Sequence, residues 1–353
     1  MTQPAIWKPA AGILLNRLAP LLDKRLESSV RPFDRPQMLR PRADSKLWAW
    51  THYGVFVPEL PEPWRYVNTM TFIGTTGTRI FDNEVLATKD PRRNATVLSS
   101  TAHDDHHHYR AYDIDGECAF AADGRHLAWG PDLTVDVEYP KFTLKGQYDT
   151  FSVDLELEAT PQVSWFVDTP VYRHLSLLAT YSGHIADASG KTAISGIGTV
   201  EYAHCVSPQS LFGGSVPQAL KLPADFFTYQ ILNLSEDTQL LLTDVRAMGV
   251  SAARLAHLRS LDGTTEVYDK VTFDVVEWAA EPQVDPAGNT MRTPRRLRWT
   301  IGDGVGVIEG VVDSPLRYGH GNGYVGAYHY EGSWRGEPVS GSGYLEWVDN
   351  EKV

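Results

Sequence analysis

A short stretch of the chain places an acid, a phenol and an imidazole within four residues: Glu201, Tyr202 and His204. The surrounding run, residues 192–204, has the β-branched and aromatic content that predicts a strand. A regular strand would put Glu201 on the face opposite to Tyr202 and His204. A glutamate desolvated by an apolar pocket has a raised pKa and can donate a proton, which makes Glu201 the leading candidate for acid chemistry. The alternative is an outward-facing Glu201, with Tyr202 and His204 in a hydrogen-bonded core.

A second group of polar residues lies on two neighbouring predicted strands. Tyr229 falls in the first strand, and Asp244 and Arg246 fall in the second. An arginine in a dry cavity can anchor a carboxylate or polarise a carbonyl oxygen, while tyrosine and aspartate can assist proton transfer. The alternative is that Asp244 and Arg246 pair with neighbouring side chains as part of the structure.

Four histidines cluster between residues 103 and 108, interleaved with two aspartates. His106 and His108 would share a strand face, a spacing that metal sites use. However, the sequence offers no third ligand at a supporting spacing, and such clusters are also common in solvated loops. We therefore predict no metal site, and two isolated cysteines, Cys118 and Cys205, predict neither structural zinc nor a disulfide.

The elements that must position these residues are mostly strands. Segments with period-two alternation recur from residue 64 onward, separated by Gly and Asp/Asn turns, which predicts an all-β protein of barrel or sandwich type. One amphipathic helix is expected over residues 12–30, with a kink at Pro20. The strand pattern lapses near residue 208. We expect a helix and connector (residues 1–44) and two lipocalin-like halves (45–208 and 209–353).

Composition narrows the class of protein. The net charge of −12 over 353 residues argues against a nucleic-acid partner, which would need clustered positive charge. The chain shows no signal-peptide pattern and no apolar run of the ~18 residues needed to span a membrane, so we expect a cytoplasmic protein. The glycine-rich segments at 302–306 and 319–323 precede no helix, so no nucleotide-binding loop is predicted. The oligomeric state is left open.

The C-terminal region carries a family resemblance. In residues 324–347 an aromatic run ending in Glu331-Gly332 leads into Gly-x-Gly-Tyr-x-Glu, with Tyr344 and Glu346 at its end. This resembles the closing strands of the carotenoid 1,2-hydratase and AttH-like double lipocalin (calycin) family, which also includes pericyclase-type cyclases. Residues 192–204, 226–246 and 294–301 match further strands of that family in order, and the match in the N-terminal half is looser.

The resemblance implies two lipocalin-like modules that hold a hydrophobic small molecule, with no cofactor. Where the hydratases have an Asp-His-Glu triplet, this chain has Glu201-Tyr-Ala203, so one carboxylate remains. We expect a cofactor-independent isomerase, cyclase, hydratase or lyase, or alternatively a carrier of lipids or terpenoids without chemistry. We expect the apolar pocket inside the N-terminal barrel or at the junction of the halves, toward which the family pattern brings an aromatic strand. Its expected ligand-binding residues are Trp48, Trp50, His52 and Tyr53, joined by Glu201, Tyr229, Asp244 and Arg246, with His204 as a further candidate for proton transfer.

Overall fold

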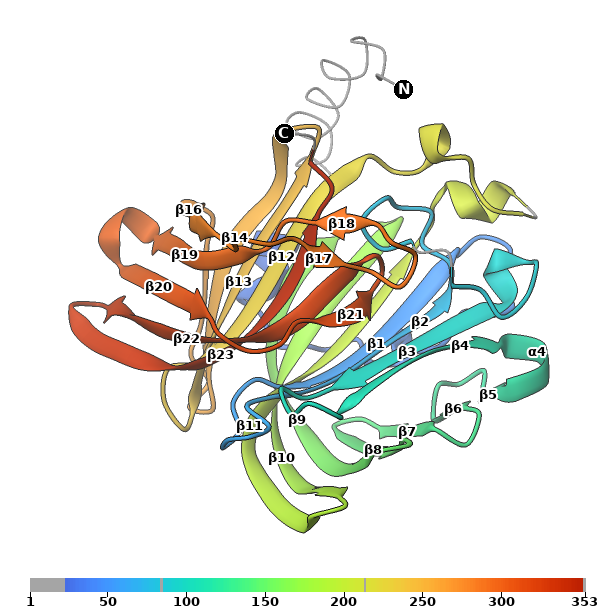
Figure 1. Ribbon diagram of the computed structural model, residues 1–353, viewed down its shortest axis with the longest axis horizontal. Helices are drawn as coiled ribbons and strands as arrows, with labels where there is room; N and C mark the ends of the chain where they lie inside the picture. Colours follow the sequence, from blue (N-terminus) through green and yellow to red (C-terminus); the bar gives the residue numbers. More distant parts are fainter. Residues whose placement is uncertain (1–22, 83–84, 213, 352–353) are drawn as a thin grey trace.

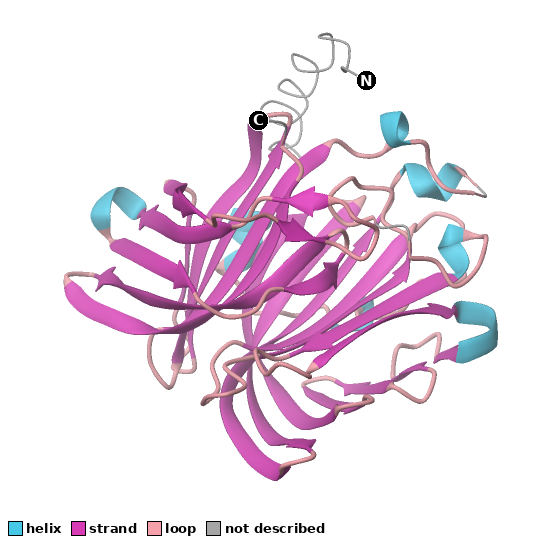
Figure 2. Ribbon diagram, in the orientation of Figure 1, coloured by secondary structure: helices cyan, strands magenta, loops and turns pink. Residues whose placement is uncertain are grey.

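The computed structural model describes residues 23–351, apart from 83, 84 and 213. The predicted fold class is confirmed, since the described chain forms two large curled antiparallel sheets with little helix. Figure 1 shows the first sheet in blue to yellow-green and the second in yellow to red, packed side by side. Figure 2 shows that strands make up most of the described chain and that the helices are short.

The first sheet has 11 strands in the order β4-β3-β2-β1-β11-β10-β9-β8-β7-β6-β5. Its two edge strands, β4 and β5, follow each other in the chain and are joined by the short helix α4 (Ile114–Glu117), so the sheet curls into a nearly closed barrel. The strands are β1 (Trp50–Val57), β2 (Val67–Gly74), β3 (Asn94–Ser100), β4 (His107–Asp113), β5 (Cys118–Phe120), β6 (His126–Trp129), β7 (Leu133–Glu138), β8 (Lys141–Gln147), β9 (Phe151–Asp168), β10 (Tyr172–Asp187) and β11 (Gly190–Cys205).

The second sheet has the order β15-β14-β13-β12-β23-β22-β20-β19-β16, with β21 paired to β22. Its first strand is therefore hydrogen-bonded to its last, and a separate two-stranded ladder joins β17 (Gln283–Val284) to β18 (Thr290–Met291). The strands are β12 (Ala224–Asn233), β13 (Thr238–Ala247), β14 (Val250–Ser260), β15 (Thr265–Tyr268), β16 (Val271–Trp278), β19 (Pro294–Ile301), β20 (Gly306–Val312), β21 (Arg317–His320), β22 (Gly323–Trp334) and β23 (Glu337–Asp349).

The structure describes only part of the helix that the sequence predicts. Most of the helix expected over residues 12–30, including Pro20, lies outside the described residues, and α3 (Arg25–Ser29) is its described part. The other helical elements are single 3₁₀ turns: η2 (Pro36–Met38), η3 (Pro91–Arg93), η4 (Pro208–Leu211), η5 (Gln218–Leu220) and η6 (Gly302–Gly304). Within the described residues, no helix is both long and apolar enough to cross a membrane.

Two predicted strands are each divided in the structure. The segment expected over 134–144 is a hairpin, β7 and β8, that turns at Tyr139-Pro140, because proline cannot continue a strand ladder. The segment expected over 267–278 breaks at Asp269-Lys270 between β15 and β16. The sheets themselves comprise residues 50–205 and 224–349. The division of the chain into domains at 45–208 and 209–353 stays a prediction.

Side-chain alternation gives the central strands of the barrel two different faces. On β1 and β11, Tyr53, Val55 and Tyr202 point into the barrel, where they join its own apolar core. Their neighbours Phe56 and Ala203 point outward and belong to a second core that is shared with the second sheet. Because the period is two, every second residue of β1 and β11 faces this junction between the sheets. The junction is where the polar residues gather.

Candidate active site

Three adjacent barrel strands place an acid and two histidines on the junction face. Glu201 on β11 is flanked by His52 on β1 and His174 on β10, both of which pair with Ala203 in register. The Glu201 Oε2 atom lies 3.5 Å from His174 Nε2 and 3.9 Å from His52 Nε2. The three ligand-type atoms all lie within 4.8 Å of one another. We call His52, His174 and Glu201 the first wall of the site.

Hydrogen bonds fix the orientation of this wall. His52 Nδ1 lies 2.8 Å from the Thr71 carbonyl oxygen, which can only accept, so Nδ1 carries the hydrogen and Nε2 faces Glu201. His174 Nδ1 lies 3.3 Å from the Tyr172 hydroxyl oxygen. From the second sheet, the Tyr229 hydroxyl donates to Glu201 Oε1 at 2.6 Å. Each member of the wall is thus held by a partner outside it.

The ionisation of Glu201 differs from the sequence expectation. Burial alone would raise the pKa of this carboxyl, as predicted, but the two imidazoles facing it outweigh burial and lower its pKa to about 2. Burial also lowers the pKa of His174, which favours a neutral imidazole. The expected raised pKa of Glu201 is therefore wrong, and the residue is a carboxylate at neutral pH. The sequence could not reveal this, because His174 reaches Glu201 only through strand pairing.

Glycine at position 54 makes room for the first wall. Gly54 pairs directly with Glu201, and a Cβ atom added there would lie 2.6 Å from the Phe56 ring and 3.0 Å from His52 Nε2. Both neighbouring side chains are buried and cannot swing away freely.

We expect Gly54→Ala to lower the free energy of unfolding by about 1–3 kcal/mol, the usual cost of overpacking a tight interior. Chemical denaturation followed by tryptophan fluorescence would measure it. Gly214→Ala is the matched control, because an added Cβ there meets no atom of the described part of the chain within 4 Å. Equal stability of the two variants would contradict the tight packing described here.

A second carboxyl group faces the junction from the other sheet. Glu346 on β23 is 3% exposed, and its Oε1 atom accepts a hydrogen bond of 3.0 Å from the Tyr344 hydroxyl. Its Oε2 atom lies 3.4 Å from Nε2 of His320 on β21. The other ring nitrogen of His320, Nδ1, contacts the Met70 sulfur at 2.9 Å. We call Glu346, Tyr344 and His320 the second wall.

The two carboxyl groups differ in ionisation. Burial, and then the negative charge of Glu201, raise the pKa of Glu346 well above its ordinary value. Burial also lowers the pKa of His320 to about 3, so this imidazole is neutral and can accept a hydrogen bond from Glu346. A site with one carboxylate and one neutral carboxylic acid holds a proton acceptor and a proton donor at the same pH.

A buried arginine crosses the junction beside the first wall. Arg259 on β14 is fully buried. Its guanidinium donates to the Ser176 carbonyl oxygen at 2.7 Å and to Gln239 Oε1 at 2.7 Å, and it also contacts the Thr199 hydroxyl. Ser176 and Thr199 belong to the barrel, whereas Gln239 belongs to the second sheet. Arg259 therefore links the two sheets and supplies a positive charge near Glu201.

Aromatic side chains enclose the polar groups. Phe166 packs edge-on against both His174 and Tyr229, with ring centroids 4.7 and 5.1 Å apart. Phe81, in the connection between β2 and β3, packs against Phe227 and covers His320 at 5.2 Å. Glu201 is only 2% exposed. A ligand must therefore displace side chains to reach either carboxyl group.

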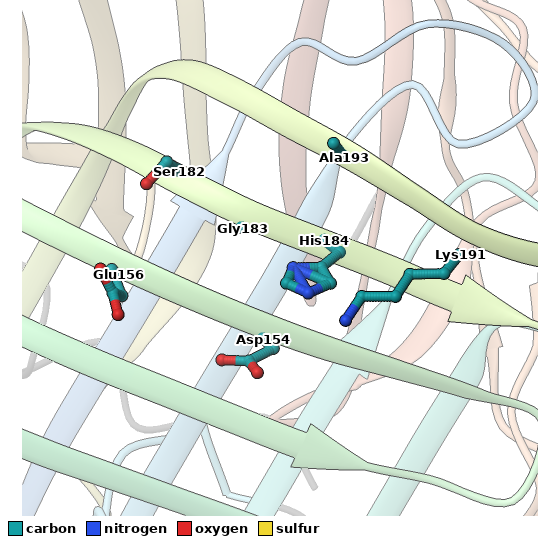
Figure 3. A pocket seen from close by; sticks show the side chains of 7 residues that line it. All are labelled: Asp154, Glu156, Ser182, Gly183, His184, Lys191 and Ala193. Carbon is teal, nitrogen blue, oxygen red and sulfur yellow. The ribbon is translucent and has the colours of Figure 1, made fainter.

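Two hollows lie away from this junction site. One, of about 600 Å3, lies on the exposed face of β9, β10 and β11. Figure 3 shows its lining, which includes Asp154, Glu156, His184 and Lys191. The other, of about 390 Å3, lies at the seam of the sheets around Arg65, whose guanidinium is paired with Asp313 at 2.7 Å. Charged and polar residues line both hollows, so neither resembles an apolar ligand pocket.

The structure brings together some of the sequence-predicted site residues. Glu201, His52 and Tyr229 meet directly, and Trp50 packs against Phe72 at 5.7 Å in the same core. Three others do not reach the junction. His204 and Tyr53 alternate to the opposite face of their strands, and Trp48 packs edge-on against His204 at 4.4 Å. Strand alternation turns Tyr53 and His204 toward the barrel interior, the other location that the sequence left open for the ligand pocket, so their roles stay predictions.

Asp244 and Arg246 are also placed on a different face from the one expected. Asp244 pairs with Thr228 rather than with Tyr229, so it projects from the other side of the second sheet. There it contacts Arg246 at 2.8 Å and Arg254 at 3.1 Å. The alternative weighed from the sequence, that Asp244 and Arg246 pair with neighbouring side chains, describes their contacts here.

Within the described chain, His106 and His108 of the histidine cluster contact different partners. His106 precedes β4 and contacts Asp187 at 3.3 Å, whereas His108 lies within β4 and bonds to the Tyr112 hydroxyl at 2.9 Å. Among the described residues, the histidine, cysteine and acidic side chains close enough to share one ion are instead those of the first wall. Cys118 and Cys205 are both free.

Three functional candidates escaped the sequence prediction, His174, Arg259 and His320, and a fourth, Glu346, was noted only as part of the closing motif. Glu346 had a usable signal, since it closes the Gly-x-Gly-Tyr-x-Glu motif. The other three stand alone in their strands, with no motif or spacing to distinguish them. Only the packing of two sheets, with residues 52, 174 and 201 opposite 320 and 346, brings them together.

The fold and the site define a class of protein: two curled antiparallel sheets with buried acidic and imidazole groups at their junction. The chain belongs to DUF6670, a family of unknown function, whose model matches residues 70–353. A comparison with curated proteins finds no match.

Solved structures share this fold across most of the chain. A putative AttH from Nitrosomonas europaea superposes with a TM-score of 0.61 at 14% identity, covering 91% of this chain and 98% of its own. Kievitone hydratase from Nectria haematococca gives 0.58 at 13% identity, covering 91% and 94%. CghA, solved with Sch210972, gives 0.50 at 9% identity, covering 86% and 89%. The resemblance seen in the sequence is confirmed at the level of the fold.

Proposed function

We propose that this protein is an enzyme that moves protons to and from a hydrophobic small molecule at the junction of its two sheets. Hydration, elimination and isomerisation are the reactions that suit such a site. The observation that carries the proposal is a pair of buried carboxyl groups, Glu201 and Glu346, contributed by different sheets and each held by histidine and tyrosine.

The chemistry follows from the two walls. In a hydration, Glu346 donates its proton to one carbon of a polarised double bond while water adds to the neighbouring carbon. The first wall accepts the proton that the water loses, and Glu346 is reprotonated when that proton is returned to it. An elimination is the reverse, and an isomerisation moves a proton between two carbons by the same groups.

Two further observations support a hydrophobic substrate. Phe72, Phe81, Phe166 and Phe227 surround the polar groups, which gives the site an apolar, aromatic boundary. Among proteins of similar fold, one is named a hydratase and another was solved with Sch210972. The alternative, a carrier without chemistry, has less support, because a carrier needs no buried carboxyl pair and would leave these costly groups unused.

Deuterium exchange tests the proposal on whichever compound the protein itself retains. Native mass spectrometry would first identify a hydrophobic compound that binds the protein with one-to-one stoichiometry. That compound is then incubated with the protein in D₂O. We expect it to gain deuterium or to change mass by one water, and Glu201→Gln to abolish the change. Glu158→Gln, an exposed acid on β9, is the matched control.

One result would favour the carrier instead. If the bound compound is returned without deuterium and without a change of mass, while the protein stays folded, the enzyme proposal fails.

A further inference from the structure

Lone pairs of the first-wall side chains face one another, an arrangement that a positive charge between them would stabilise. Because the Thr71 carbonyl fixes the hydrogen of His52 on Nδ1, a neutral His52 directs the Nε2 lone pair toward Glu201 Oε2. The carboxylate oxygen is itself an acceptor, so two acceptors face each other at 3.9 Å. His174 Nε2 is buried nearby and has no hydrogen-bond partner among the described residues. A positive ion between the three atoms would satisfy all of them.

The spacing suits a metal ion better than a hydrogen bond. The Glu201 Oε2 distances of 3.5 and 3.9 Å exceed a normal hydrogen bond between nitrogen and oxygen. Two ligands that each bind zinc at about 2.0–2.1 Å in tetrahedral geometry lie about 3.3 Å apart, close to the 3.5 Å between Glu201 and His174. The other atom pairs of the wall lie within 4.8 Å and would move closer around an ion.

The surroundings also match those of metal ligands. A histidine that binds zinc usually donates its other ring N–H to a carbonyl or similar group, as His52 does to Thr71. His174 Nδ1 has the Tyr172 hydroxyl, and the Tyr229 hydroxyl holds Glu201 Oε1, which leaves Oε2 directed at the imidazoles. Two histidines and one glutamate are a ligand set of catalytic zinc sites that keep a position open for water.

We infer that His52, His174 and Glu201 bind a zinc ion at the junction of the two sheets. This departs from the sequence expectation, which considered metal only at the cluster of residues 103–108. The inference deepens the proposed function and rests on it only for the role of the ion. In that role a bound zinc would take the place of the first wall as the group that activates water. It would lower the pKa of the water, whose proton would pass to solvent, so that hydroxide could add to one carbon of the double bond while Glu346 donates a proton to the other.

Cobalt and zinc titrations test the binding independently of any reaction. The purified chain is freed of metal with a chelator, titrated with Co²⁺ and followed by visible absorption. Zinc content after reloading is measured by mass spectrometry of the elements. We expect one Co²⁺ per chain, displaced by Zn²⁺, and affinities at least about 100-fold weaker in His52→Ala and His174→Ala. Tyr229→Phe, which keeps all three ligands, should weaken binding by about 10- to 100-fold.

Two control variants make the result specific. His204→Ala removes a buried histidine from the other face of β11, and His106→Ala removes a buried histidine from the cluster of residues 103–108. Both should bind Co²⁺ as the unchanged chain does. The inference fails if the chain binds less than one ion, if His174→Ala binds as tightly as the unchanged chain, or if His106→Ala is the variant that loses the bands.

Failure of this inference is distinguishable from failure of the proposed function. A chain that binds no metal but still exchanges deuterium into its ligand contradicts the zinc site alone. A chain that binds one zinc at the first wall but returns its ligand unchanged contradicts the enzyme alone.

Discussion

Glu346→Gln is expected to lower turnover by about 10²- to 10⁴-fold, the usual contribution of a positioned acid, while leaving the protein at least as stable as before. Glutamine has the same shape as a neutral glutamic acid, so it can still accept from Tyr344 and donate to His320. What it cannot do is release a proton. Activity and stability should therefore change in opposite directions.

The sign of the pH dependence follows from the raised pKa of Glu346. Between the ordinary value of 4.5 and that raised pKa, the folded protein keeps the proton and the unfolded chain has lost it. Unfolding then releases a proton, so stability falls as the pH rises through this window. Glu346→Gln removes that loss, and its advantage over the unchanged chain should grow with pH.

Denaturant titrations of metal-free protein from pH 4.5 to 8 would measure this difference. Glu331→Gln, an exposed acid on the neighbouring strand β22, is the matched control and should leave both turnover and the pH slope unchanged. A variant that loses stability in parallel with activity would show that Glu346 is a structural group.

Arg259→Met is expected to lower the free energy of unfolding by about 3–5 kcal/mol, because it removes one member of a buried charged network. The substitution removes the Arg259 donor from the Ser176 carbonyl oxygen and leaves Gln239 Oε1 with the Thr199 hydroxyl as its remaining donor across the junction. It also leaves the buried Glu201 carboxylate without a compensating positive charge nearby. Methionine fills a similar length, so the loss reflects polar contacts more than a cavity.

The matched control for Arg259 is an arginine whose ion pair is exposed to solvent and contributes little to stability. Arg298→Met breaks an exposed contact with Glu309 at 3.6 Å, in which both side chains are about half exposed. Such pairs contribute about 0–1 kcal/mol. Urea unfolding of both variants would compare them. A cost for Arg259→Met as small as that for Arg298→Met would show that the junction does not depend on this guanidinium.

Much of the fold could be predicted from the sequence, because strands have a local signature. Alternation of aromatic and polar residues revealed β22 and β23, and the same alternation correctly put Glu201 on the face opposite to Tyr202 and His204. Errors arose where a turn had no glycine, as at Pro140, since proline alone does not separate a bend from an edge strand.

The site was less predictable, because it depends on which face of each strand meets the other sheet. A strand pattern shows that Asp244 and Tyr229 lie on adjacent strands, but only the register, with Tyr229 opposite Thr243, shows that they face apart. His174 and Arg259 reach the site through pairings and sheet packing that span many residues. No local spacing contains that information.

The pairing of β12 with β23 has a consequence for the order of folding events. Within the first wall, Glu201 and His174 lie on consecutive strands, whereas His52 reaches them only when β1 pairs with β11, far along the chain. The second wall likewise needs residue 346 to join a strand that begins at residue 224, which closes a loop of more than a hundred residues. Contacts between such distant parts of a chain form late and slowly. During refolding, Glu201 and His174 should thus come together first, and chemistry should return only after both His52 and Glu346 have joined them.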